Sequence, residues 1–379
     1  MDESAQTGAA RGRALWLSTI SFTICFAVWT IFSIIGISIK QKLGLNETEF
    51  GLLVGLPILS GSLIRLVLGA WTDQYGGRRV NTIVMLAAAV STYFLTWAHT
   101  YPQFLVAAFF VGIAGGSFAV GVAYVSRFYP AGKQGTALGI FGAGNVGSAV
   151  TKLLAPFVMV AFGWEMVAQV WAAVLAVMAV IFWVFSEEDP VMRERRARGE
   201  KPKSVWLEFA PLKNIQVWRF SLYYFFVFGA FVALALWLPQ YLINVYGVNL
   251  KAAGMIAAMF SIPASIFRAY GGHLADRYGA RRVMYWSLLV GVACTFILSY
   301  PPTDYVVRTV TGSVGFHLEM GLVPFTVTVF VLGFFMALGK AAVFRHIPVY
   351  YPDNVGVVGG LVGMIGGLGG FVLPIAFGI

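Results

Sequence analysis

The stretch from Arg65 to Arg79 reads RLVLGAWTDQYGGRR, and a second copy from Arg268 to Arg282 reads RAYGGHLADRYGARR. Both copies keep an Arg, a Gly four residues later, an Asp four further on, a Gly three further on, and a closing pair of arginines. The two copies are 203 residues apart (268 − 65). We therefore expect an internal duplication, with one copy of this motif in each half of the chain.

The first arginine of each copy is expected to lie deep in a membrane. If the residues up to Asp73 are helical, Arg65 lies about 12 Å further along the axis, at about 1.5 Å per residue. A hydrocarbon core is about 30 Å thick, so Arg65 and Arg268 fall near its midplane. A cation there is costly unless an anion offsets it, and such residues are functional candidates. One arginine from each half predicts an anion site on the duplication axis.

The composition places the chain in a lipid bilayer. It is 59% hydrophobic and 11% charged, with a mean hydropathy of +0.79, which is too apolar for a soluble domain. Hydropathy predicts an all-α polytopic protein with spans at 14–39, 50–71, 80–98, 102–128, 135–161, 164–185, 218–245, 252–274, 283–300, 322–344 and 355–378.

A charged segment with three prolines separates the first six spans from the last five. The expected domains are an N-terminal six-helix half at 1–186, a cytoplasmic linker at 187–217, and a C-terminal half at 218–379. A duplication of six-helix halves requires a twelfth helix, and truncation of the sequence is the simplest explanation for its absence.

The net charge of +10 follows membrane topology rather than nucleic-acid binding. Eighteen of the 26 lysines and arginines fall on the side of the N-terminus and the linker, and only four on the other. By the positive-inside rule, that first side is cytoplasmic. The remaining four basic residues lie inside expected spans: Arg65, Lys152, Arg268 and Lys340.

Several motifs carry a family resemblance. GAWTDQYGGRR and GGHLADRYGARR each resemble the cytoplasmic loop motif of the major facilitator superfamily. AGKQGTALGIFGAGNVGSAVTKLLAP and VGVVGGLVGMIGGLGGFVLP resemble the two glycine-rich motifs of its nitrate/nitrite porter family, and GGSFAVGVAYVSRFYP also fits. GKAAVFRHIPVYYPDNVG, which contains Lys340, looks closer to the proton-coupled importer branch than to the exchanger branch.

The resemblance implies a fold of two pseudo-symmetric halves and a set of substrate-binding residues. In that family, arginines at the positions of Arg65 and Arg268 bind the anion. By local motif match, four further residues would line the site: Asn145, Phe118, Tyr224 and Phe228. The family also implies a bacterial cytoplasmic membrane location and a role in nitrate respiration or assimilation.

These residue types suit nitrate on chemical grounds. Nitrate is planar and monovalent, and a guanidinium offers coplanar donors in a fixed fork. The competing interpretation is a salt bridge to each arginine, but the expected spans hold few carboxylates. Asn145 is expected either to bind the anion or to satisfy a neighbouring backbone group.

Two lysines inside expected spans require separate interpretations. Lys340 is a proton-coupling candidate, because Lys can release its proton whereas Arg cannot; the alternative is snorkelling to the cytoplasmic face. Lys152, two turns beyond Asn145, either attracts anions or snorkels, and we expect it to snorkel.

The paired motif and the glycine-rich helices predict moving parts. A charge network that holds one gated conformation is expected from Asp73, Arg78, Arg79, Asp276, Arg281 and Arg282, although the paired arginines could serve only to enforce topology. Hinge glycines are expected at Gly142, Gly144, Gly147, Gly363, Gly366 and Gly367, with dense helix packing as the alternative.

The sequence favours a monomeric secondary transporter that imports nitrate by proton symport with alternating access. The alternatives are a nitrate/nitrite antiporter and, in another class, a nitrate-binding membrane receptor without transport. No phosphate-binding GxxxxGK[ST] motif, HExxH motif or Cys/His cluster occurs. We therefore expect neither enzymatic activity nor a cofactor or metal, and nitrate, nitrite, protons and lipid as partners.

Overall fold

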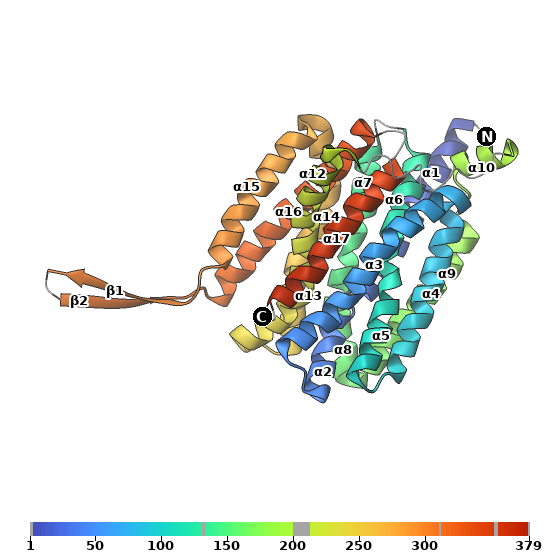
Figure 1. Ribbon diagram of the computed structural model, residues 1–379. Helices are drawn as coiled ribbons and strands as arrows, with labels where there is room; N and C mark the ends of the chain where they lie inside the picture. The colour runs from blue at the N-terminus through green and yellow to red at the C-terminus, as the bar shows by residue number, and fades with distance from the viewer. Residues whose placement is uncertain (1–2, 131–132, 200–212, 311, 352–354, 378–379) are drawn as a thin grey trace.

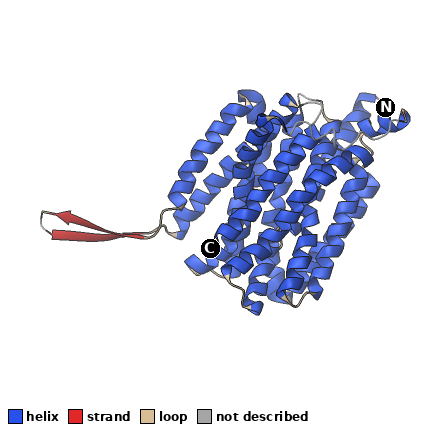
Figure 2. Cartoon of the chain, viewed as in Figure 1, coloured by secondary structure: helices blue, strands red, loops and turns tan. Residues whose placement is uncertain are grey.

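The computed structural model describes residues 3–130, 133–199, 213–310, 312–351 and 355–377. Within these ranges, eleven helical segments are long and apolar enough to cross a membrane. The segments are Gly8–Leu43, Glu47–Tyr75, Gly77–Trp97, Tyr101–Phe128, Gln134–Phe162, Trp164–Phe185, Ile215–Tyr246, Leu250–Tyr278, Ala280–Leu298, Leu322–Ile347 and Val357–Ala376. The all-α membrane architecture expected from hydropathy is confirmed (Figure 2).

The first half contains six spans in chain order, and three of them are interrupted. The elements are α1 (Glu3–Trp29) with α2 (Phe32–Leu43), α3 (Glu47–Tyr75), α4 (Gly77–Phe94) with η1 (Leu95–Trp97), α5 (Tyr101–Val111) with η2 (Gly112–Gly116) and α6 (Ser117–Phe128), α7 (Gln134–Gly142) with η4 (Ala143–Val146) and α8 (Gly147–Phe162), and α9 (Trp164–Phe185). A short helix, α10 (Pro190–Ala197), begins the expected linker; residues 200–212 of that linker lie outside the described ranges.

The second half contains the remaining spans and a pair of strands. The elements are α12 (Ile215–Tyr224) with the π-helical η6 (Phe225–Ala230) and α13 (Phe231–Tyr246), α14 (Leu250–Tyr278), α15 (Ala280–Leu298), β1 (Thr303–Thr309), β2 (Gly312–Leu318), α16 (Leu322–Tyr350) and α17 (Val355–Phe377).

The duplicated motif builds the same local structure twice. Asn46 caps α3 by accepting a hydrogen bond from the Glu49 amide, and Asn249 caps α14 in the same way. Each helix ends at a motif glycine with positive φ, 86° at Gly76 and 88° at Gly279. A side chain with a Cβ would be strained in that conformation, so the motif requires glycine at this turn. The next helix, with the paired arginines, begins directly after it.

Helices of the two halves pack against each other in two pairs. α3 packs along α17, and α14 packs along α7, η4 and α8 (Figure 1). α3 and α17 are antiparallel. Because both pairs of helices pack along their length, the two halves are in contact near both ends of the molecule. We call the end with α10 and the N-terminus the N-terminal face, and the opposite end the hairpin face.

The hairpin from 303 to 318 was not expected from the sequence. β1 and β2 pair antiparallel from Thr303 opposite Leu318 to Thr309 opposite Gly312, and they project away from the helices (Figure 1). Its side chains are mostly exposed, with Val306 at 69% and Phe316 at 50%. Hydropathy windows detect long apolar runs, whereas a two-residue alternation leaves a strand without a strong signal in them.

Candidate functional site

Arg65 lies in the middle of α3 and is completely buried. Its Nε donates to the carbonyl oxygen of Gly115 at 3.0 Å, and its Nη1 donates to that of Gly363 at 2.6 Å. Gly115 belongs to the first half and Gly363 to the second, so this guanidinium bridges the two halves. Its Nη2 has no hydrogen-bond partner among the described atoms, which leaves both N–H donors of that nitrogen free.

Arg268 lies in the middle of α14 and is also buried. Its Nε and Nη1 have no hydrogen-bond partner among the described atoms. None of the ion pairs that the structure describes involves Arg65 or Arg268. The alternative of an internal salt bridge is therefore wrong within the described residues. A buried charge without a counter-ion is costly, so this pair is poised for an anion.

Aromatic rings surround both guanidinium groups. The Phe118 ring centroid lies 5.3 Å from the guanidinium carbon of each arginine, so this one ring lies between the two. Trp29 and Phe228 also face Arg65, at 5.0 and 5.4 Å, and Phe344 faces Arg268 at 5.4 Å. Such contacts each stabilise a desolvated cation by about 0.5–2 kcal/mol, which offsets part of the cost of burial.

Tyr224 and Phe228 complete this aromatic wall. They lie one turn apart, and their rings stack at 4.8 Å with an angle of 6°. The Phe228 ring is also nearly parallel to that of Phe118, at 6.3 Å and 17°. Tyr224 lies near both arginines and nearest to Arg268, although no hydrogen bond of normal geometry to its hydroxyl is described. The sequence-based match of Phe118, Tyr224 and Phe228 thus selects rings that lie together.

Asn145 and Ser62 are among the other buried polar side chains that lack a hydrogen-bond partner within the described residues. Asn145 is fully buried, and both its Oδ1 and its Nδ2 lack a partner among the described atoms. The neighbouring Gly142 is close to Arg268, since a Cβ there would lie 2.4 Å from Nε. Ser62, which the sequence analysis missed, is buried one turn before Arg65 with an unpaired hydroxyl. Asn145 therefore does not satisfy a neighbouring backbone group, and it is available to a ligand.

The helices change their winding where they surround this cluster. The 3₁₀ segment η2 presents the Gly115 carbonyl to Arg65, the 3₁₀ segment η4 contains Asn145, and the π-helical η6 contains Phe228. Irregular backbone at membrane depth is tolerated where it is buried in protein or lines a cavity, and mid-helix breaks mark functional sites. Three such breaks around one group of residues indicate a binding centre.

Lys340 and Lys152 are both fully buried. Lys340 Nζ lies 3.4 Å from the ring centroid of Phe231 and has no hydrogen-bond partner among the described atoms. Lys152 Nζ donates to the carbonyl oxygen of Ser148 and to the hydroxyl of Ser261, both at 3.1 Å. The expectation that Lys152 snorkels is wrong, because Ser261 provides a partner in the other half.

The motif aspartates pair with arginines that the sequence analysis did not assign to them. Asp73 forms an ion pair with Arg127, and Asp276 forms one with Arg345. Arg127 and Arg345 each stand three residues before a proline, as RFYP and RHIP, which is the signal that could have identified them. Thr136 of the first half donates to Asp276 at 3.1 Å, so Asp276 also contacts the opposite half.

The paired arginines lie elsewhere because they begin the next helix. Arg78 donates twice to the Trp183 carbonyl within its own half, at 3.1 and 2.6 Å, and Arg281 contacts the Tyr285 hydroxyl one turn on. Arg79 and Arg282 are exposed, and the structure gives neither an ion pair within the described ranges. Of the six expected gating residues, the described contacts bring only Asp276 to the other half.

Close helix contacts shut the site from both faces. At the hairpin face, a Cβ on Gly51 would lie 2.8 Å from the Pro374 carbonyl oxygen, and one on Gly254 would lie 2.4 Å from that of Lys152. At the N-terminal face, a Cβ on Gly272 would lie 2.9 Å from the Gly135 carbonyl oxygen. Each contact joins the two halves, so the structure is in an occluded arrangement.

Five of the six predicted hinge glycines are positions of close packing, and Gly363 alone of the six would accept a Cβ. Three of the six face the opposite half: Gly142 against Arg268, Gly363 against Phe118, and Gly367 against Ser62. The others pack within their own half, namely Gly144 and Gly147 against α1 and Gly366 against Tyr224. This geometry explains the small residues by dense packing; hinge motion stays a prediction.

Substitution of two of these glycines should have opposite outcomes. A Cβ on Gly147 would lie 1.9 Å from the Thr23 carbonyl oxygen, whereas a Cβ on Gly363 would make contacts of 3.6 Å or more. We expect Gly147→Ala to lower the free energy of unfolding by about 1–3 kcal/mol through overpacking. Gly363→Ala should unfold at the wild-type temperature in detergent, and equal melting temperatures for both variants would contradict this interpretation.

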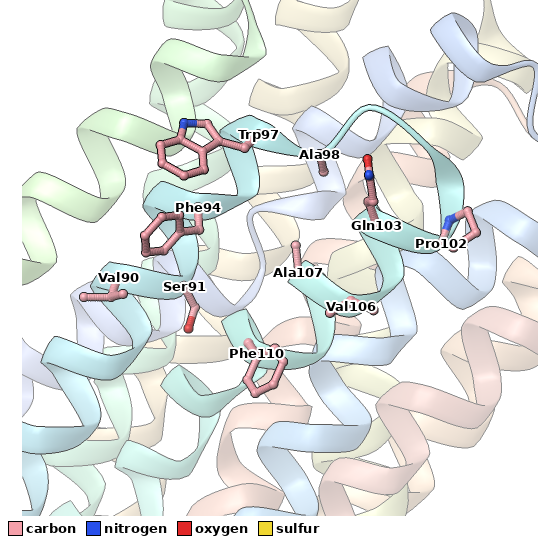
Figure 3. Close-up of a pocket in the computed structure, with 10 residues that line it drawn as sticks. All are labelled: Val90, Ser91, Phe94, Trp97, Ala98, Pro102, Gln103, Val106, Ala107 and Phe110. Carbon is pink, nitrogen blue, oxygen red and sulfur yellow. The ribbon is translucent and has the colours of Figure 1, made fainter.

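An apolar groove of about 610 Å³ lies between α4 and α5, away from these residues (Figure 3). It is lined mainly by exposed apolar side chains, including Phe94, Trp97, Val106 and Phe110. Such a surface suits lipid chains rather than an anion.

Comparisons with known proteins agree with this architecture. The family model described as "Major Facilitator Superfamily" matches residues 17–374. A relative from Thermus thermophilus, named "Probable nitrate/nitrite antiporter NarK1", is 42% identical, over 97% of this chain and 84% of the relative. The chain belongs to the nitrate/nitrite porter family of the major facilitator superfamily. It is therefore a multi-pass membrane transporter, not an enzyme.

Other relatives of this porter have related names. The "Nitrite extrusion protein" of Bacillus subtilis is 31% identical over 95% of the porter and 85% of the relative. The "Probable nitrate transporter NarT" of Staphylococcus haemolyticus is 29% identical over 96% and 88%. The placement nearest the proton-coupled branch stays a prediction.

A solved structure shares the porter's fold. A bacterial homologue of the human lysosomal transporter Spinster, in an inward-facing and occupied conformation, superposes with a TM-score of 0.67 at 18% identity. The match covers 97% of the porter and 81% of the other chain. The major facilitator fold expected from the motifs is confirmed.

Proposed function

We propose that this porter imports nitrate by proton symport, with Arg65 and Arg268 as the substrate-binding pair. The observation that carries the proposal is a set of buried, unpaired donors contributed by both halves: Nη2 of Arg65, Nε and Nη1 of Arg268, and Nδ2 of Asn145. An anion that accepted these hydrogen bonds would satisfy both the charge and the donors. The names of the relatives, which refer to nitrate and nitrite, support this choice of anion.

The aromatic wall favours a flat substrate. Phe118, Tyr224 and Phe228 present nearly parallel ring faces beside the two guanidinium groups. The ring centroids are only 4.8 and 6.3 Å apart, so the rings form a flat wall rather than a slot. A planar ion such as nitrate fits beside such a wall, whereas tetrahedral sulfate and phosphate are thicker and carry more charge. We infer that this wall and a single compensating charge together select nitrate and nitrite.

Alternating access would proceed by rocking the two halves, 1–186 and 218–379, about this centre. Arg65 bonds to Gly363, and Phe118 lies between both arginines, so the site is divided between the halves. Like charges on opposite halves repel each other, and a bound anion offsets that repulsion. The bound substrate would thus favour the occluded arrangement. From there the protein could open to the other side of the membrane.

Lys340 is the proposed proton carrier. It is buried on α16 without a carboxylate among the described ion pairs and interacts electrostatically with Arg268. A bound anion near Arg268 would stabilise a positive Lys340, so nitrate and proton would each strengthen the binding of the other. Nitrate/nitrite exchange is the second candidate, favoured by the name of the 42% identical relative. A nitrate receptor without transport is the alternative from another class.

We further propose that the N-terminal face is cytoplasmic and that the host membrane is a bacterial inner membrane. The N-terminal face carries Arg11, Arg13 and the basic residues of α10, in agreement with the positive-inside rule. The site is enclosed within one chain, so a monomer is sufficient for the proposed activity.

Uptake into proteoliposomes tests this function directly. Purified protein is reconstituted, and nitrate uptake is measured with an inward proton gradient, without one, and with internal nitrite. Symport predicts uptake that requires the gradient; exchange predicts uptake that requires internal nitrite instead. Protein-free liposomes are the control. Nitrate binding without flux under any of these conditions would contradict the transport proposal and favour a receptor.

A further inference from the structure

Lys152 makes an intramembrane contact between the halves that the central site does not explain. It lies on α8, is completely buried, and donates to Ser261 of α14 at 3.1 Å and to Ser148 of its own helix at 3.1 Å. An ammonium has three donors, and these two bonds use two of them. No described ion pair places a carboxylate on it.

The contact repeats the central site at a level nearer the hairpin face. Lys152 follows Asn145 by seven residues, and Ser261 precedes Arg268 by seven. Seven residues are about two helical turns, or about 10 Å, and keep nearly the same helix face. The packing that places Gly142 against Arg268 also places Lys152 against Ser261, nearer the hairpin face.

The backbones of the two helices are also in close contact about two turns nearer the hairpin face than Ser261. A Cβ on Gly254 would lie 2.4 Å from the Lys152 carbonyl oxygen and 3.0 Å from Cγ of Pro156. Opening of the hairpin face requires α8 and α14 to separate here. That separation breaks the bond to Ser261 and exposes the ammonium to the opening on the route to Arg65 and Arg268.

We propose that Lys152 is an outer binding station for a monovalent oxyanion. With the hairpin face open, its ammonium captures the anion ahead of the arginine pair; with that face closed, Ser261 replaces the anion as its partner. A point charge attracts an anion without demanding a particular shape, whereas the fork of an arginine binds one geometry. The anion would thus bind first at Lys152 and then at Arg65 and Arg268, where its shape is selected. The inference rests on the proposed nitrate transport.

The test compares Lys152→Gln with wild type and with Lys152→Arg in the same proteoliposomes. We expect Lys152→Gln to raise the KM for nitrate uptake about tenfold, equivalent to about 1.4 kcal/mol, with kcat retained. Lys152→Arg keeps the charge and should keep KM close to wild type. The KM of wild type should rise with ionic strength more steeply than that of Lys152→Gln, because salt screens an exposed charge.

The matched control is Lys251→Gln. It removes a positive charge at the hairpin-face end of α14, where Lys251 lies over the Phe157 ring at 5.1 Å, and should leave KM unchanged. Nitrate binding to detergent-solubilised Lys152→Gln, measured by calorimetry, should persist because the arginine pair is intact. Lys152→Met, of similar volume, takes the place of Lys152→Gln if that variant does not fold.

The outcomes separate this inference from the proposed function. Wild-type protein that neither binds nor transports nitrate would overturn the proposed function. Wild-type transport together with an unchanged KM in Lys152→Gln would overturn the outer station alone. A loss of kcat with unchanged KM would identify Lys152 as a structural contact between the halves and would equally overturn it.

Discussion

Arg65→Lys should reduce nitrate affinity by at least about 100-fold, equivalent to about 2.7 kcal/mol, although the positive charge is kept. The fork of Arg65 makes two bonds to fixed carbonyl oxygens, Gly115 in one half and Gly363 in the other, and its Nη2 is buried without a partner among the described atoms. A lysine has neither the planar fork nor the reach to make these contacts together. The affinity is measured by calorimetry in detergent, and transport by uptake into proteoliposomes.

The control for this variant is Arg308→Lys, a substitution of the same chemistry in the exposed hairpin. It should bind and transport nitrate as wild type does. The monodispersity of Arg65→Lys in detergent establishes that the fold is retained. Wild-type affinity in Arg65→Lys would mean that charge alone binds the anion, and the role assigned to guanidinium geometry would be abandoned.

The two arginines at the centre of the site could be predicted because the duplicated motif shows how deep each of them lies in the membrane. A motif with an Arg eight residues before a helix-ending Asp places that Arg at the membrane midplane in both halves. The spans located by hydropathy contain few carboxylates. The sequence therefore predicts two buried arginines without a carboxylate partner. The structure agrees, with both side chains buried and neither in a described ion pair.

The residues around that centre were harder to predict. Trp29 and Phe344 face the arginines, but the chain contains 11 Trp and 32 Phe, and no spacing distinguishes the rings that line the site. Ser62 is equally inconspicuous. What sets these residues apart is a contact between distant spans, and one sequence read by itself does not record such contacts.

Lys152 shows why a general rule about lysines failed. Snorkelling is favoured when a membrane lysine has no polar partner at its own depth. Here Ser261, 109 residues further along the chain, supplies one through the packing of α14 on α8. The hairpin at 303–318 was missed for another reason. Its strands show a two-residue alternation, whereas a search for membrane helices looks only for long apolar runs.

Lys340→Ala should abolish the dependence of nitrate uptake on a proton gradient while nitrate/nitrate counterflow persists. Lys340 lies over the Phe231 ring at 3.4 Å and interacts with Arg268, so it senses the charge of the occupied site without belonging to the guanidinium pair. Its removal takes away a proton carrier but leaves the anion-binding donors in place. We expect gradient-driven accumulation to fall at least about tenfold, on the scale of a lost proton-transfer group.

Two further variants make this outcome decisive. Lys340→Arg keeps the positive charge but cannot release its proton, so it should fail in gradient-driven uptake as Lys340→Ala does. Lys42→Ala removes an exposed lysine and should behave as wild type. If Lys340→Arg still accumulates nitrate under the gradient, the proton does not travel on this side chain. Since Arg65 and Arg268 cannot release protons under these conditions, another titratable group would then have to carry the proton, and the role assigned to Lys340 would be abandoned.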